Sequence, residues 1–271
     1  MKLNNIKARW NAGQTVLNGW LSIANAFTAE IMAEQGYDAL TIDLQHGFVG
    51  YEQATHMLQA MRASGVAPMV RVPWLEPGII MKSLDAGAWG IICPMISTAE
   101  QAQTLVSCVR YPPHGSRSFG PTRVTFSAGQ DYGQQADDHV VCLAMIETAE
   151  AFDNIEAIVA TPGLDGVYIG PADLTLGLTG RKYRTGFDRT EPEIVDAIKH
   201  ILVTAHRAGK KAGLHNGSAA YAANAAQWGF DLVTLSNDVQ LLRGAAASSV
   251  QQFRELNGNG QATPSTQPGG Y

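Results

Sequence analysis

The sequence has few of the features that mark several large classes of protein. Its three cysteines, Cys93, Cys108 and Cys142, are widely spaced and form no CxxC pair, which excludes a disulfide scaffold and a cysteine-built zinc site. No run of basic residues is longer than two, and 19 Lys and Arg face 24 Asp and Glu, so the clustered positive charge of a nucleic-acid surface is missing. No apolar stretch approaches the roughly 18 residues of a membrane-spanning helix, and the N-terminal residues lack the apolar segment of a signal peptide. We therefore expect a cytoplasmic protein without nucleic-acid or membrane partners.

The chain has 271 residues, of which 45% are hydrophobic, and this is enough for one large domain with a full core. Eight short apolar runs recur along it, and their continuous apolar character is typical of parallel strands covered on both faces. The runs are 16–23, 37–44, 67–72, 89–95, 140–147, 164–170, 210–215 and 230–235, and alanine-rich segments of helical periodicity lie between them, such as 26–35, 51–65 and 193–209. Eight strand–helix units predict an α/β fold, a (β/α)8 TIM barrel, over residues 1–256.

Three further features bear on this fold. A doubly wound sheet is the alternative, but it normally has fewer strands, and the GxGxxG loop typical of it is absent after the first run. Residues 257–271 are polar and aperiodic, so we expect a disordered tail. Residues 111–138 are the one long connection, and a loop of that length inside a compact domain is usually functional.

In such barrels the active site lies at the C-terminal ends of the strands. Glu147 ends the fifth apolar run, and Asp173 follows the sixth within GPAD. Two carboxylates at the ends of adjacent strands can share one hard divalent cation, with water or substrate oxygens at its other positions. The alternative is that they are solvated loop acids or N-caps of the following helices.

Arg71 and His46 are candidates for the chemistry itself. Arg71 lies inside the apolar run MVRVPW, where a guanidinium needs an anionic partner. It either forms a structural ion pair or holds a substrate carboxylate or a developing enolate oxygen. His46 shares the short DLQHG loop with Asp43, which favours a catalytic over a structural role. Trp20, Gln45 and His215 also stand at this end of the barrel.

Lysine is missing from this end of the barrel, although imine catalysis would need one there. Lys210 and Lys211 begin the seventh run at the opposite end, and the other five lysines fall in helices, loops or the N-terminus. A divalent cation is therefore left as the electron sink.

Six segments, taken in order, make roughly residues 5–256 resemble the HpcH/HpaI family of class II, metal-dependent pyruvate aldolases. They are IDLQHG (42–47), VRVPW (70–74), MKSLDAGAWGIICPM (81–95), RYPPHGSRSFGP (110–121), MIET (145–148) and GVYIGPADL (166–174). Each is weak alone, but together on the expected barrel elements they are specific. IDLQHG and RSFGP are most similar to the branch that acts on hydroxypyruvate and pyruvate.

The resemblance implies a lyase that makes or cleaves 4-hydroxy-2-oxo acids. The reaction would pass through a metal-bound enolate of pyruvate or hydroxypyruvate, with an aldehyde as second substrate. Glu147 and Asp173 would bind Mg²⁺, Mn²⁺ or Co²⁺, and Arg71 would stabilise the enolate. Backbone amides near Ala172 and Asp173 would bind the substrate carboxylate.

The resemblance also assigns supporting roles. His46, paired with the aspartate that matches Asp85, would help a metal-bound water move the proton. Trp20 would contact the substrate. Asp43 and Gln45 would lie around the catalytic and metal-binding residues without touching the substrate themselves. Members are typically homo-hexamers, trimers of dimers, in which the last helix is exchanged between neighbours and the long loop lies near a neighbour's site.

The sequence departs from the family at two positions. Gln45 replaces a common glutamate, which removes one negative charge near the cation, and Met145 replaces a glutamine of some relatives. Asp85 ends an expected helix, which places it near the opposite rim of the barrel. Two other functions stay open: an acyl-CoA lyase of the citrate-lyase type, for which no adenine- or pyrophosphate-binding feature is visible, and a ligand-binding barrel without turnover.

Overall fold

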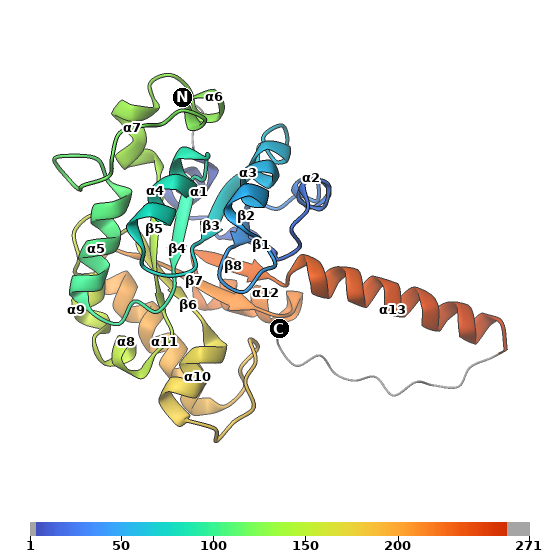
Figure 1. The fold of residues 1–271 in the computed structure, drawn as a ribbon. Helices are drawn as coiled ribbons and strands as arrows, with labels where there is room; N and C mark the ends of the chain where they lie inside the picture. The colour runs from blue at the N-terminus through green and yellow to red at the C-terminus, as the bar shows by residue number, and fades with distance from the viewer. Residues whose placement is uncertain (1–3, 259–271) are drawn as a thin grey trace.

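Eight parallel strands close into a barrel, in which each strand pairs with the next along the chain and β8 pairs with β1 (Figure 1). The structure is a computed structural model that describes residues 4–258. The strands are β1 (Val16–Leu21), β2 (Ala39–Asp43), β3 (Ala67–Arg71), β4 (Gly90–Cys93), β5 (Val141–Ile146), β6 (Gly166–Ile169), β7 (Lys211–Asn216) and β8 (Leu232–Leu235). Each overlaps one of the eight apolar runs, and the expected (β/α)8 barrel is confirmed.

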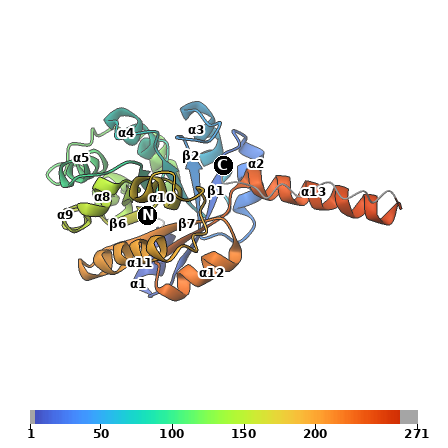
Figure 2. The same ribbon diagram turned by 90° about the horizontal axis from the view of Figure 1, so that it is seen from below.

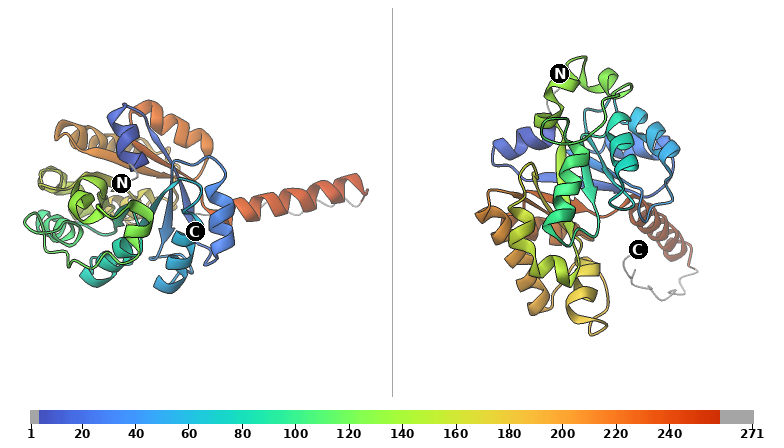
Figure 3. Two further views of the ribbon diagram at one scale, coloured as in Figure 1. Left: turned by 90° about the horizontal axis from the view of Figure 1, so that it is seen from above. Right: turned by 60° about the vertical axis from the view of Figure 1, so that its left-hand side comes forward.

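Helices surround the strands on the outside of the barrel, as the end-on views show (Figures 2 and 3). Local signals set several of their ends: α4, α10 and α11 begin with proline, and Gly209 follows α11 with a φ of 69°. The helices are α1 (Asn5–Asn11), α2 (Ala26–Ala33), α3 (Tyr51–Ala60), α4 (Pro77–Asp85), α5 (Ala99–Val109), α6 (Val124–Ala128), α7 (Tyr132–His139), α8 (Ala149–Asp153), α9 (Ile155–Val159), α10 (Pro171–Thr179), α11 (Pro192–Arg207), α12 (Ala219–Trp228) and α13 (Asp238–Leu256).

The buried side chains form two hydrophobic clusters. The larger one fills the space between the strands and the surrounding helices. The second fills the barrel interior with large side chains such as Trp20, Met69 and Tyr168, and α1 closes it with Ile6 and Trp10. Because the strands are covered on both faces, their runs are almost wholly apolar. The three cysteines are buried and free, as expected.

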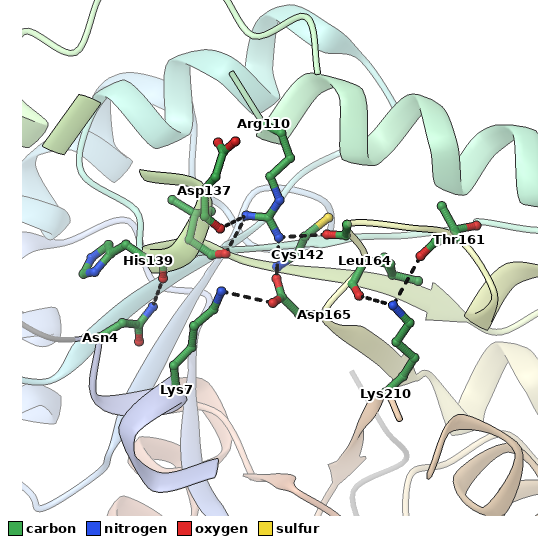
Figure 4. Close-up of polar contacts among 12 residues, drawn as sticks. Asn4, Lys7, Arg110, Asp137, His139, Cys142, Thr161, Leu164, Asp165 and Lys210 are labelled. Atoms are coloured by element: carbon green, nitrogen blue, oxygen red, sulfur yellow. Dashed lines mark hydrogen bonds and ion pairs between the residues drawn. The ribbon is translucent and has the colours of Figure 1, made fainter. Parts of the chain in front are cut away.

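Polar contacts close the N-terminal end of the barrel (Figure 4). Asp165, just before β6, forms ion pairs with Lys7 of α1 (3.0 Å) and with Arg110 (2.6 Å). Arg110 also donates to three backbone carbonyls, Asn4 to two and Lys210 to two. Ion pairs and hydrogen bonds therefore hold the N-terminal end of the barrel together.

The connection 111–138 contains more regular structure than the sequence indicated. It includes α6 and most of α7, which lie at the N-terminal end of the barrel (Figure 1). The expectation of one long loop is corrected here, because helices of 5 and 8 residues are too short to show a clear periodicity. The segment is anchored by Arg117, whose buried guanidinium pairs with Asp85 at 2.6 Å.

Helix α13 leaves the barrel and projects away from it (Figures 1 and 3). Its only buried residue is Asp238, whose carboxylate accepts the backbone N–H groups of Ser22 (2.9 Å) and Ile23 (3.0 Å). No helix among residues 4–258 is long and apolar enough to cross a lipid bilayer. The tail expected at 257–271 lies, from residue 259 on, outside the described residues.

Candidate active site

Arg71 at the end of β3 forms a buried ion pair with Asp43 at the end of β2. Its Nε and Nη2 donate to the two carboxylate oxygens of Asp43 at 2.8 and 2.6 Å. The Trp20 indole N–H also donates to Asp43 (3.2 Å), and the guanidinium lies 4.9 Å from the Trp20 ring centre. Burial alone would raise the pKa of Asp43, but the hydrogen bonds and charge of Arg71 outweigh it and lower this pKa. The side chain of Arg71 is thus fixed in orientation and fully charged.

Asp43 also shapes the loop that carries His46. Its Oδ1 accepts the backbone N–H groups of Gln45 (3.0 Å) and His46 (3.2 Å). A Cβ at Gly47 would lie 2.3 Å from the Asp43 carbonyl oxygen, so the turn requires glycine. The sequence DLQHG therefore builds a tight turn that presents the exposed side chain of His46 at the C-terminal rim.

Glu147 follows β5 and is 2% exposed. Its Oε1 accepts the backbone N–H of Met95 at 2.9 Å, and Met95 has a φ of 57°, a conformation uncommon for a non-glycine residue. A Cβ at Gly170 would lie 2.4 Å from Glu147 Oε2 and 2.6 Å from Met145 Cε. Glycine at the start of GPAD is therefore what allows this buried carboxylate to fit beside the next strand.

Asp173 lies in the first turn of α10, which follows β6, the strand that pairs with β5 beside Glu147. Proline at the first position and Gly170 as the N-cap start this helix directly after β6. The N–H groups of a first helical turn have no partner within the helix, and this includes those of Ala172 and Asp173. The helix start thus presents a carboxylate and amides that can bind an anion.

The two carboxylates lie close enough to influence each other. The pKa of Glu147 is raised to about 7: burial is the largest cause, the negative charge of Asp173 adds to it, and the Met95 N–H and Arg71 oppose it. Because Arg71 is already paired with Asp43, a divalent cation would balance the remaining negative charge of Glu147 and Asp173.

The donor set fits a cation that keeps open positions. Among residues 4–258, no group of three or more His, Cys, Asp or Glu side chains is arranged to hold a metal. Two carboxylates therefore leave several positions for water or substrate oxygens. The side-chain Oε1 of Gln45 is buried without a hydrogen-bond partner among the described residues.

The structure adds an aromatic wall that sequence reasoning missed. His215 at the end of β7 is buried, with its ring 4.3 Å from Phe187 and 4.7 Å from Trp20. The pKa of His215 is lowered to about 3: burial is the largest cause, the charge of Arg71 adds to it, and Asp43 opposes it. His215 is thus neutral and lies 2.9 Å from the Tyr168 hydroxyl. Its position at a strand end was visible in the sequence, but nothing signalled that Phe187, from the segment before α11, joins it.

Asp85 stands apart from these residues. It is the last residue of α4, and helices of this barrel run back toward the N-terminal ends of the strands. His46 lies at the other end, and Asp85 pairs with Arg117 (2.6 Å). The pairing of Asp85 with His46 therefore stays a prediction.

The lysines lie as the sequence indicated. Lys211 is the first residue of β7 and pairs with Asp231 at 2.8 Å, while Lys210 donates to backbone carbonyls at the N-terminal end. Lys82 and Lys199 lie in α4 and α11, Lys7 lies in α1, and Lys182 pairs with Glu193. None of the lysines in residues 4–258 follows the C-terminal end of a strand.

Comparisons with known proteins identify the family to which this chain is similar. A model of the HpcH/HpaI aldolase/citrate lyase family matches residues 16–242. The chain is 43% identical over 254 residues to the hydroxypyruvate/pyruvate aldolase of Rhizorhabdus wittichii, which covers 94% of this chain and 100% of the relative. It is 34% identical over 256 residues to the 5-keto-4-deoxy-D-glucarate aldolase of Klebsiella pneumoniae, covering 93% and 97%.

Among solved structures, an HpcH/HpaI aldolase/citrate lyase family protein from Burkholderia cenocepacia has a TM-score of 0.84 at 32% identity, over 93% of this chain and 99% of the other. These matches confirm the resemblance stated from the six segments and the expectation of an aldolase. The chain belongs to the HpcH/HpaI aldolase/citrate lyase family.

Proposed function

We propose that this protein is a divalent-metal-dependent aldolase that makes or cleaves 4-hydroxy-2-oxo acids, with pyruvate or hydroxypyruvate as donor and an aldehyde as acceptor. The observation that carries the proposal is the buried carboxylate of Glu147, close to Asp173 and Arg71 at one end of the barrel. The aldolases named above, from Rhizorhabdus wittichii and Klebsiella pneumoniae, support it.

Glu147 and Asp173 would hold the cation, which we propose to be Mg²⁺, Mn²⁺ or Co²⁺. When bound, it supplies positive charge that stabilises the negative charge developing on the substrate oxygens. The N–H of Met95 orients the Glu147 carboxylate through its hydrogen bond. With a neutral Gln45, less negative charge surrounds the cation than a glutamate would provide.

Other residues of the site would bind the substrate, stabilise its developing charge and exclude water. The N–H groups of Ala172 and Asp173 bind the carboxylate of the 2-oxo acid. Arg71, held by Asp43, places its charge beside the keto oxygen, where the enolate develops. Trp20 and the neutral ring of His215 form the wall beside it and exclude water.

His46 would move the proton at the aldehyde end, since it is exposed on its loop at the C-terminal rim. Its partner Asp85 lies at the other end of the same barrel, so we propose that the pair forms between two subunits. The side chain of Asp85 is 28% exposed and remains accessible to a neighbour.

A homo-oligomer, a hexamer built as a trimer of dimers, would also cover α13. This helix carries exposed apolar side chains along its length: Val239, Leu241, Leu242, Val250, Phe253 and Leu256. Burying each one would contribute roughly 1.5–3 kcal/mol, so we propose that α13 is exchanged with a neighbouring subunit. The three free, buried thiols support a reducing, cytoplasmic location.

The proposal is tested by mixing pyruvate or hydroxypyruvate with a panel of aldehydes, with and without chelator. We expect a 4-hydroxy-2-oxo acid to form only when a divalent cation is present. Product formation in chelator, or no product with any aldehyde and added Mn²⁺, would contradict the proposal.

A further inference from the structure

A cavity lies at the N-terminal end of the barrel, opposite the candidate active site. Its walls come from the end of α3, the residues before β3, the turn before β4, and α6. Its volume is about 460 Å³, which is within the range of small-molecule sites, about 300–1,000 Å³.

The lining of this cavity carries positive charge that no acidic side chain among the described residues balances. Arg62 and Arg123 both line it, and no Asp or Glu does. Neither arginine belongs to the ion pairs found among residues 4–258. The chain as a whole has a formal charge of −5, so two neighbouring arginines without acidic partners are a local exception to its net negative charge.

Backbone contacts hold both guanidiniums in place. Arg123 donates through Nη1 to the Ala86 carbonyl and through Nη2 to the Leu58 carbonyl (3.2 Å), and Arg62 donates to the Phe126 carbonyl (2.7 Å). A guanidinium has five N–H donors, so most donors of both residues remain available to a ligand.

Gly87 makes the close approach of Arg123 possible. It has a φ of 111°, and a Cβ there would lie 2.3 Å from Arg123 Nη1. Burial lowers the pKa of Arg123, and the positive charge of Arg62 lowers it further, as expected where a counter-charge is missing.

The rest of the lining is largely apolar. Leu58, Met61, Val66 and Trp89 face the cavity beside the two arginines, and all four are otherwise buried. An apolar wall next to two cations is complementary to a molecule with an anionic head and a hydrocarbon body.

We propose that this cavity binds a small organic anion, with carboxylate or phosphate oxygens between Arg62 and Arg123 and an aliphatic or aromatic body on Leu58, Met61 and Val66. The cavity lies at the opposite end of the barrel from this chain's own candidate active site, and the proposal does not depend on the aldolase activity.

Titration calorimetry on the full chain tests this, with octanoate and octyl phosphate as probes and 1-octanol and inorganic phosphate as controls. We expect saturable binding of at least one of the two anions, one molecule per chain. Binding of octanoate but not octyl phosphate identifies a carboxylate site, and the reverse identifies a phosphate site. Neither control should bind within about tenfold of that affinity, because each lacks half of the complementary chemistry.

Arg62→Gln should weaken binding at least about tenfold, because it removes a charge-assisted contact from an exposed side chain without disturbing the fold. Arg207→Gln is the matched control, since it removes the same charge from an exposed residue of α11 that does not line the cavity. Trp89→Phe should abolish the ligand-induced change in tryptophan fluorescence while binding remains, which locates the ligand.

Three outcomes would overturn the proposal. The first is no saturable binding of either anion. The second is equal weakening by Arg62→Gln and Arg207→Gln. The third is a loss of binding in Arg62→Gln that coincides with a change in oligomer mass, which would make the cavity a contact between subunits.

Discussion

Asp43 and Arg71 are the last residues of β2 and β3, and the register of the sheet pairs them directly. Their side chains are 2% and 3% exposed and are joined by two hydrogen bonds. The position of the candidate catalytic arginine thus follows from the pairing of two neighbouring strands. The structural ion pair that the sequence left open is present, and we propose that it also orients Arg71 toward the substrate.

Asp43→Asn should lower aldol cleavage about 10- to 100-fold and the free energy of unfolding by roughly 3 kcal/mol, since the buried guanidinium loses its charged partner. Urea unfolding and cleavage rates measure the two effects. Glu156→Gln breaks the exposed pair with Arg207 and should cost less than about 1 kcal/mol. Equal effects of the two substitutions would show that burial of the Asp43–Arg71 pair has no special role.

Arg71 and His46 should differ in how they affect proton exchange at the pyruvate methyl group. Arg71→Ala should lose both exchange and aldol cleavage by about 10²–10³-fold, because both pass through the enolate. His46→Ala should impair cleavage but leave appreciable exchange, because it acts at the aldehyde end. NMR in deuterated buffer follows both variants. Wild-type exchange in Arg71→Ala would reduce Arg71 to a structural ion-pair partner, and equal loss in both would move His46 to enolate formation.

The affinity for a divalent cation should depend on pH around neutrality. The pKa of Glu147 is raised to about 7, so this carboxyl holds a proton at lower pH and must release it to bind a metal. Affinity should therefore fall by about tenfold per pH unit below that pKa and level off above it. Titration of metal-free protein with Mn²⁺ between pH 5.5 and 8 measures this, and a flat profile would contradict it.

Much of the fold and part of the site were predictable from the sequence. The eight apolar runs overlap the eight strands because both faces of every strand are covered, and the strand ends directed attention to Glu147 and Asp173. The contact of Asp43 with Arg71 depends on strand register, which the runs do not specify. Phe187 joins the site from an irregular segment without a periodic signal, and α6 and α7 are too short to recognise.

Helix α13 should be needed for assembly. Leu242→Glu and Phe253→Glu each place a charge on an exposed apolar position of the helix, and both should shift the protein toward smaller species. Sedimentation measures the mass, with Ser248→Glu as a control at an exposed polar position of the same helix. A wild-type monomer with full activity at micromolar concentration would contradict both the oligomer and the proposed partnership of Asp85 with a neighbour's His46.

The most direct test of the central claim is pyruvate methyl-proton exchange in deuterated buffer, followed by NMR in wild type and Asp173→Ala, with chelator and after added Mn²⁺. We predict that exchange in the wild type stops in chelator and returns with Mn²⁺, and that Asp173→Ala remains at least about 10²-fold slower than the wild type after Mn²⁺ is added. Undiminished exchange in chelator, together with an imine trapped by borohydride, would contradict the account.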